Sequence, residues 1–126
     1  MIVGVGLDLV DIERAERLLA AKGRRALDRL LTPREAAYVL ERAVPAPSLA
    51  ARLAAKEAAF KALSGTEEAR GIGWREIEVE RAADGRPSLT CHGRAAARIA
   101  ELAVRRVHLT MTHTTTTAAA VVVLES

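Results

Sequence analysis

The chain of 126 residues has little of three things: cysteine, aromatic residues and long apolar runs. Cys91 is the only cysteine, which excludes an intrachain disulfide and fits a reducing compartment. With one Phe, one Trp and one Tyr, the core has to be built from Leu, Val, Ile and Ala. The N-terminus lacks the pattern of a signal peptide, and the longest apolar run, residues 118 to 124, is too short to span a bilayer. We therefore expect a soluble cytoplasmic protein with no membrane partner.

The chain also lacks a strong charge excess and most short catalytic signatures. Its formal net charge of +3 favours acidic partners over basic ones but does not by itself imply nucleic acid. A nucleic-acid-binding protein, the first alternative, would need a continuous basic stripe or stacking aromatics, and the aromatics here are scattered. There is no G-x-S-x-G motif, no P-loop and no metal-ligand spacing among the three histidines. The length predicts a single domain over residues 1–126.

A strong helix signal is present over residues 49 to 65, which read LAARLAAKEAAFKALSG. This stretch has no β-branched residue and no internal proline, and it is rich in strong helix formers. We expect Ser48 as the N-cap and Gly65 as the left-handed residue that ends the helix. Leucines and Phe60 form one stripe and alanines occupy the opposite side. The helix is therefore expected to be covered on two sides and largely buried.

Glu57 and Lys61 lie on the boundary between these two faces, spaced i, i+4 so that they are neighbours. An exposed pair with this spacing contributes only about 0.2–0.5 kcal/mol to helix stability. On a helix that is apolar on both sides, however, buried charges need partners or a ligand. The spacing alone leaves both interpretations open.

Residues 2 to 9 are typical of a strand in which one face carries glycines and Asp8. Such a face often marks the close approach of another backbone or of a ligand. Asp8 is either the N-cap of the following helix or part of a ligand site. His113, at the end of the strand over residues 107 to 112, is likewise either a core residue or a ligand contact.

A basic patch follows on the amphipathic helix that we predict over residues 11 to 21 and just beyond it. This patch is either a solvated helix face or a landing site for an acidic protein. It comprises Arg14, Arg17, Lys22, Arg24 and Arg25.

The remaining patterns predict an α+β fold, with a helical first half and one long central helix packed on an antiparallel sheet. Thr32 to Glu35 reads as a capping box that starts a helix over residues 33 to about 42. Residues 45 to 47 read as a rigid connector and residues 66 to 73 as a polar loop. From Trp74 the period changes to two, which predicts a half-exposed strand with Glu78 facing solvent. A hairpin at Asp84-Gly85, a strand over 87 to 91, a helix over 93 to 103 and strands over 107 to 112 and 118 to 124 complete an antiparallel meander.

Three segments together resemble one family. Residues 4 to 14, GVGLDLVDIER, are similar to the opening of holo-[acyl-carrier-protein] synthases. Residues 51 to 63, ARLAAKEAAFKAL, are similar to their central helix, and residues 110 to 114, TMTHT, to their late Ser/Thr-x-Ser-His-Thr strand. The order and spacing of the segments also match. Relatives carry Gly-Thr-Gly after the central helix, where this chain has Ser64-Gly65-Thr66.

The resemblance implies the 4′-phosphopantetheinyl transferase fold and a magnesium-dependent transferase of lipid and fatty acid biosynthesis. Such enzymes move phosphopantetheine from coenzyme A to a serine of apo-acyl carrier protein and release adenosine 3′,5′-bisphosphate. The resemblance assigns Asp8 and Glu57 as Mg²⁺ ligands, consistent with the oxygen ligands that this ion prefers. Glu57, directly or through a metal-bound water, would help to deprotonate the serine, and Lys61 would stabilise or protonate the leaving phosphate.

The resemblance also implies binding residues and an assembly. Coenzyme A would be bound by Arg52, Lys61, Gly65 and His113. Arg14, with Arg17 and Arg24 in the same basic patch, would contact the acidic carrier protein. Members of this kind are homotrimers with active sites between protomers. The second alternative, an inactive assembly module, is disfavoured because Asp8, Glu57 and Lys61 are all present.

Overall fold

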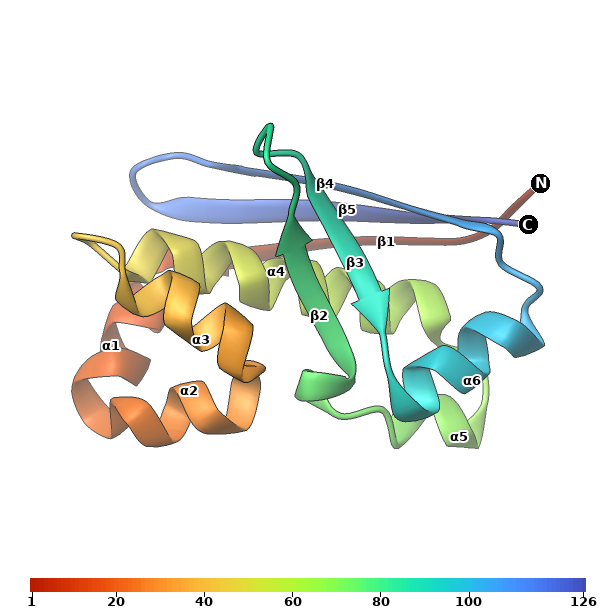
Figure 1. Cartoon of the computed structure of the whole chain (residues 1–126), viewed down its shortest axis with the longest axis horizontal. Coiled ribbons are helices and arrows are strands. Elements are labelled where there is room, and N and C mark those ends of the chain that lie inside the picture. Colours follow the sequence, from red (N-terminus) through yellow and green to blue (C-terminus); the bar gives the residue numbers. More distant parts are fainter.

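A computed structural model describes residues 1–126 and shows one long helix packed along a three-stranded antiparallel sheet (Figure 1). Shorter helices gather at both ends of this helix, and a separate hairpin crosses its other side. The α+β class predicted from the sequence is confirmed. The elements in chain order are β1 (Ile2–Asp11), α1 (Ile12–Lys22), α2 (Arg24–Leu30), α3 (Pro33–Leu40), α4 (Ala46–Leu63), α5 (Glu67–Arg70), the 3-10 turn η1 (Trp74–Glu76), β2 (Ile77–Arg81), β3 (Pro87–Cys91), α6 (Gly93–Glu101), β4 (Arg106–His113) and β5 (Thr117–Glu125).

The main sheet has the order β1-β5-β4, so the first and last strands of the chain are neighbours. The predicted meander is wrong in this respect, because β2 and β3 form a hairpin of their own outside this sheet. Strand β5 takes the central position, and its burial alternates along its length, with Ala118, Ala120, Val122 and Leu124 buried against α4. Both termini lie at one end of the sheet, where the N–H of Ser126 donates to the carbonyl of Met1 (Figure 1).

Helix α4 is mostly buried, as the two-sided apolar pattern predicts. It begins at Ala46, so the predicted N-cap Ser48 and the predicted rigid connector are both wrong. Ala46 and Pro47 lie in the first turn. The N–H groups of that turn have no carbonyl partner within the helix, so the N–H that proline lacks costs no hydrogen bond. The hydroxyl of Ser48 instead accepts a hydrogen bond from Arg52 Nη1 at 2.8 Å. The helix ends at Leu63, and Gly65 follows with a φ of 121°, a conformation that favours glycine.

Two further expectations about the chain after α4 are wrong. The predicted loop over residues 66 to 73 contains the short helix α5, whose N-cap Thr66 accepts a hydrogen bond from the N–H of Ala69. Glu78 is buried rather than solvated, because α3 packs over that face of β2. Its two carboxylate oxygens bond the hydroxyl of Thr32 and the Nε2 atom of His92, so the buried charge is satisfied. These bonds hold the pKa of Glu78 below its usual value although burial opposes them.

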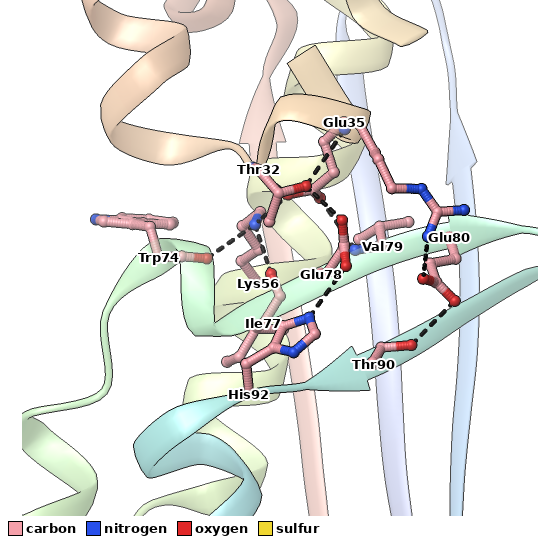
Figure 2. A network of polar contacts seen from close by, with 11 residues as sticks. Thr32, Glu35, Lys56, Trp74, Ile77, Glu78, Val79, Glu80, Thr90 and His92 are labelled. Atoms are coloured by element: carbon pink, nitrogen blue, oxygen red, sulfur yellow. Dashed lines mark hydrogen bonds and ion pairs between the residues drawn. The ribbon is translucent and has the colours of Figure 1, made fainter. Parts of the chain in front are cut away.

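A buried ion pair anchors α4 on the side away from the sheet (Figure 2). Lys56 is fully buried, and its Nζ donates to Glu35 Oε1 at 2.8 Å and to the carbonyls of Trp74 and Ile77. All three ammonium donors are therefore used. Glu35 also accepts from the N–H of Val79 at 3.0 Å and closes the predicted capping box, which is confirmed. The pair joins α3, α4, η1 and β2 through satisfied polar groups.

On the sheet side, β1 approaches α4 so closely that only glycine fits at two positions. A Cβ atom at Gly6 would lie 1.7 Å from the carbonyl oxygen of Ala58, and one at Gly4 would lie 2.4 Å from that of Ala62. The small alanines of α4 allow the same approach from the helix side. The prediction that the glycine face of this strand meets another backbone is confirmed, and Asp8 is carried on the same face.

We predict that Gly6→Ala separates β1 from α4 and destabilises the protein. The new methyl group would meet a backbone oxygen that cannot rotate away, so we expect a loss of about 3 kcal/mol in the free energy of unfolding. Urea denaturation measures this loss. Gly73→Ala is the matched control, because a Cβ there meets no atom closer than 3.6 Å. Equal stability of the two variants would contradict the close approach.

Candidate functional site

Asp8 lies on β1 with its side chain turned to α4, and only 12% of that side chain is exposed. Lys61 Nζ donates to Asp8 Oδ1 and to the carbonyl of Leu7, both at 2.9 Å. The second oxygen, Oδ2, is buried and has no hydrogen-bond partner. The strand continues to Asp11, which takes the N-cap position of α1. The N-cap interpretation of Asp8 is therefore wrong, and its unpaired oxygen is free to bind a ligand.

Glu57 lies beside Asp8 and accepts a hydrogen bond from Arg14 Nη2 at 3.2 Å. Burial and the adjacent Asp8 carboxylate together raise the pKa of Glu57 to about 7, although Arg14 opposes the shift. The pKa of Asp8 is lowered although burial opposes the shift, because the neighbouring Glu57 carboxyl and the hydrogen bond and charge of Lys61 favour the ionised form of Asp8. Near neutral pH, Asp8 is therefore ionised and Glu57 is poised between its two protonation states.

These contacts join four charged side chains from three elements into one cluster: Asp8 from β1, Arg14 from α1, and Glu57 and Lys61 from α4. Lys61 pairs with Asp8, and Glu57 pairs with Arg14, rather than with each other. The interpretation of Glu57 and Lys61 as a simple exposed helix pair is therefore wrong. We call these four residues the acidic-basic cluster.

Arg52 and His113 lie in a second place, where both line one cavity together with Tyr38. Arg52 is only 2% exposed, and its guanidinium carbon lies 4.3 Å from the centroid of the Tyr38 ring. The guanidinium groups of Arg42 and Arg81 lie on the same ring, at 4.4 and 5.5 Å. The Nε atom of Arg52 is buried without a partner, and Arg52 and Arg81 form no ion pair with a carboxylate. Converging cations of this kind favour an anionic ligand.

His113 is exposed at the end of β4, so its interpretation as a core histidine is wrong. It lines a cavity of about 220 Å³ together with the arginines on Tyr38. Sequence reasoning missed Tyr38, Arg42 and Arg81, because they come from α3, its C-terminal end and β2, and no local spacing links them. We call Tyr38, Arg42, Arg52, Arg81 and His113 the arginine cluster.

The geometry of α4 separates the two clusters. Arg52 and Glu57 are five residues apart, which places them about 140° apart around the helix axis. Arg52 therefore points with Lys56 toward α3 and β2, whereas Glu57 points with Lys61 toward β1 and α1. The structure brings together Asp8, Glu57 and Lys61. It also brings together Arg52 and His113, which line a cavity that none of those three residues lines.

Gly65 lies in a third place, at the C-terminal end of α4. It lines a cavity of about 570 Å³ that Lys61 itself does not line. The other lining residues come from the end of α4 and from α5: Phe60, Ser64, Thr66, Glu67, Ala69 and Arg70.

The basic patch is exposed along its whole length, including Arg14. Arg17 pairs only with Glu13 and Arg24 only with Asp28, both with largely exposed side chains. Arg14 differs from them because it bonds Glu57. Lys22, Arg25 and Arg29 line a cleft of about 390 Å³ between α1 and α2.

The donor set of the acidic-basic cluster fits a magnesium ion. No group of three or more His, Cys, Asp or Glu side chains converges anywhere in the chain, so a fully protein-made metal cage is absent. Magnesium, however, commonly takes one or two carboxylates and completes its shell with water and substrate phosphates. Asp8 and Glu57 provide two adjacent carboxylates, and Asp8 Oδ2 is free of other partners.

None of the helices is long and apolar enough to cross a membrane. Comparisons with known proteins show the family to which the chain belongs. The family model of the 4′-phosphopantetheinyl transferase superfamily matches residues 4–121. A holo-[acyl-carrier-protein] synthase of Nitratidesulfovibrio vulgaris is 48% identical over 126 residues, which is 100% of both chains. The crystal structure of the Neisseria meningitidis synthase superposes with a TM-score of 0.87 at 32% identity, over 100% of both chains.

A second solved structure adds a ligand. The Bacillus anthracis synthase, described in complex with CoA (3′,5′-ADP), is 32% identical with a TM-score of 0.80, over 100% of this chain and 98% of that one. The family model matches almost the whole chain, and a full-length relative is 48% identical. A shared fold alone does not require such similarity in sequence. The chain therefore belongs to the 4′-phosphopantetheinyl transferase superfamily, within the family of holo-[acyl-carrier-protein] synthases.

Proposed function

We propose that the protein transfers 4′-phosphopantetheine from coenzyme A to a serine of an apo-acyl carrier protein. The serine oxygen forms a bond to the phosphorus that carries pantetheine, and the bond from that phosphorus to the bridging oxygen breaks. The bridging oxygen leaves with adenosine 3′,5′-bisphosphate. The observation that carries this function is the acidic-basic cluster of Asp8, Glu57 and Lys61 in a chain of this family.

Glu57 is suited to take the proton of the attacking serine. Without Mg²⁺ its pKa is about 7, and Mg²⁺ bound at the same carboxylate would favour the ionised form, which can accept the proton directly or through a metal-bound water. Asp8 next to it stays ionised, so the two carboxylates divide the roles of base and fixed negative charge.

Lys61 is suited to offset the negative charge that develops on the leaving phosphate. Its Nζ lies 2.9 Å from Asp8 Oδ1, where a phosphate held beside the two carboxylates by Mg²⁺ would meet it. Asp8 and Glu57 would hold Mg²⁺, which when bound neutralises pyrophosphate charge. Lys61 now occupies one oxygen of Asp8, and Oδ2 is the oxygen left for the ion.

The positions of Arg52 and His113 support a homotrimer with active sites between protomers. Arg52 and Arg81 of the arginine cluster have no carboxylate partner, and the cluster would bind phosphate groups of coenzyme A, yet it lies apart from Glu57 within one chain. A neighbouring protomer can supply the missing half. The outer face of the sheet supports this assembly, because Val5, Leu7 and Leu9 are 60%, 56% and 65% exposed there.

The basic patch is the proposed contact for the acidic carrier protein, with Arg14, Arg17 and Arg24 as its members. Arg14 also bonds Glu57, so a substitution there would disturb the acidic-basic cluster at the same time. Arg17 touches only Glu13 and is therefore the position at which the contribution of the patch to carrier binding can be isolated.

Mass spectrometry tests the reaction class directly. Purified apo-acyl carrier protein incubated with this protein, coenzyme A and Mg²⁺ should gain roughly 340 Da, the mass of one phosphopantetheine group. Glu57→Gln should abolish most of this gain while the protein remains folded by circular dichroism. An unchanged carrier mass with the wild-type protein would refute the proposal.

We predict a pH dependence of stability that comes from Glu57. Its pKa is about 7 in the folded state and near 4.5 when unfolded, so between these values the folded protein binds more protons than the unfolded chain. This contribution to stability is present below pH 4.5 and is lost as the pH rises through 7. The melting temperature of the wild type relative to Glu57→Gln should therefore fall between pH 5 and pH 7.5. A constant difference across that range would show that the pKa of Glu57 is not raised.

We predict that the protein is a trimer and that Leu7→Arg dissociates it. Light scattering should give about three times the monomer mass of 13.5 kDa for the wild type. A charge on the outer sheet face should give a folded monomer with little transfer activity, because each site would lose one half. Leu40→Arg, which also replaces an exposed leucine but on α3, should remain a trimer. An active monomer would argue against sites between protomers.

A further inference from the structure

We infer that Arg98, on α6, is a positioning residue for coenzyme A, because its guanidinium group holds the chain segment that forms one wall of the cavity beside Gly65. The inference rests on the proposed function, since it takes that cavity to receive part of coenzyme A. The segment is residues 64 to 66, which connect α4 to α5.

Arg98 reaches from α6 to the C-terminal end of α4. Its Nε donates to the carbonyl of Leu63 at 2.8 Å, and its Nη2 donates to the carbonyl of Ser64 at 3.1 Å. The side chain is only 11% exposed, and Glu101 pairs with its remaining nitrogen at 3.4 Å. The last carbonyls of a helix have no partners within the helix, so they need donors from elsewhere. Arg98 satisfies two of them with one planar, charged group.

The next residue, Gly65, packs directly on this guanidinium group. A Cβ atom at Gly65 would lie 3.4 Å from Arg98 Nη2, and the φ of 121° turns the chain sharply at this point. On its other side the segment is held by Thr66, whose hydroxyl caps α5. Ser64, Gly65 and Thr66 form one wall of the cavity. Arg98 holds this wall through the carbonyls of Leu63 and Ser64, and Thr66 ties it to α5.

Arg98 also changes the electrostatics of this end of α4. A helix C-terminus carries a partial negative charge of about half a unit, which would repel a phosphate in the neighbouring cavity. The guanidinium group on the last carbonyls offsets that charge. Arg98 lines the far side of the segment rather than the cavity itself, so it acts through residues 64 to 66 and not by contact with the substrate.

Steady-state kinetics of Arg98→Met tests this inference. Methionine keeps much of the buried aliphatic length but removes both hydrogen bonds and the charge. We expect the KM for coenzyme A to rise about tenfold, which corresponds to about 1.4 kcal/mol, while the KM for apo-acyl carrier protein stays unchanged. Arg94→Met is the matched control, since Arg94 lies on the same helix and donates to a single carbonyl, that of Gly71, at 2.8 Å. The control should leave both KM values unchanged.

Other outcomes overturn the inference. Equal rises in both KM values, or a fall in kcat that only follows the folded fraction, would mean that Arg98 is merely structural. Where Arg98→Met does not fold, Arg98→Lys decides: it keeps the charge but cannot bridge two carbonyls, and we expect a rise of about threefold in the KM for coenzyme A. A wild-type KM in that variant contradicts the inference. A wild-type protein without transfer activity contradicts the proposed function, and this inference with it, whereas an active wild type with unchanged Arg98→Met kinetics contradicts only the role of Arg98.

Discussion

The close contact between β1 and α4 is the constraint on which the rest of the structure depends. Gly4 and Gly6 leave no Cβ atoms between the strand and the carbonyls of Ala58 and Ala62, so two backbones meet directly. Asp8 is two residues farther along the same face of β1 and is thereby held against the last turns of α4, where Lys61 donates to it. A larger residue at Gly6 would therefore change the position of Asp8 as well as the packing of the core.

The same contact produces the chemistry of the acidic-basic cluster. Close packing removes water from Glu57 and places the charge of Asp8 beside it, and these two effects raise the pKa of Glu57 toward neutrality. On the opposite side of α4, Lys56 is held by Glu35 and two carbonyls (Figure 2). Because Lys56 precedes Glu57 in the chain, this buried pair also limits rotation of α4 about its axis. Strand contact on one side and ion pair on the other thus orient Glu57.

Local signals in the sequence predict much of the fold, whereas contacts between distant segments are not predicted. Helix formers, the capping box at Thr32 and the glycine face of β1 act over a few residues, and the structure confirms them. Resemblance at the level of motifs identifies Asp8, Glu57 and Lys61, which the structure brings together. The pairing of Lys56, the burial of Glu78 and the arginine cluster on Tyr38 join α3, α4 and β2. The hydrophobic periodicity of a single segment does not predict contacts between these three elements. The alternation along β2 alone places Glu78 on the solvent-exposed face, whereas it is buried.

The division of charges around α4 explains why one chain is an incomplete enzyme in the proposed mechanism. Glu57 and Lys61 must face β1 to meet Asp8, and the helical repeat then turns Arg52 about 140° away, toward Tyr38. One bound coenzyme A has to contact both the acidic-basic cluster and the arginine cluster. No rotation of α4 about its axis brings the two clusters to the same side. Joining the clusters through a second copy of the chain removes this conflict without changing the helix. The exposed Val5, Leu7 and Leu9 lie on the same strand as Asp8, on its opposite face. Strand β1 therefore positions the acidic-basic cluster with one face and offers the surface for assembly with the other.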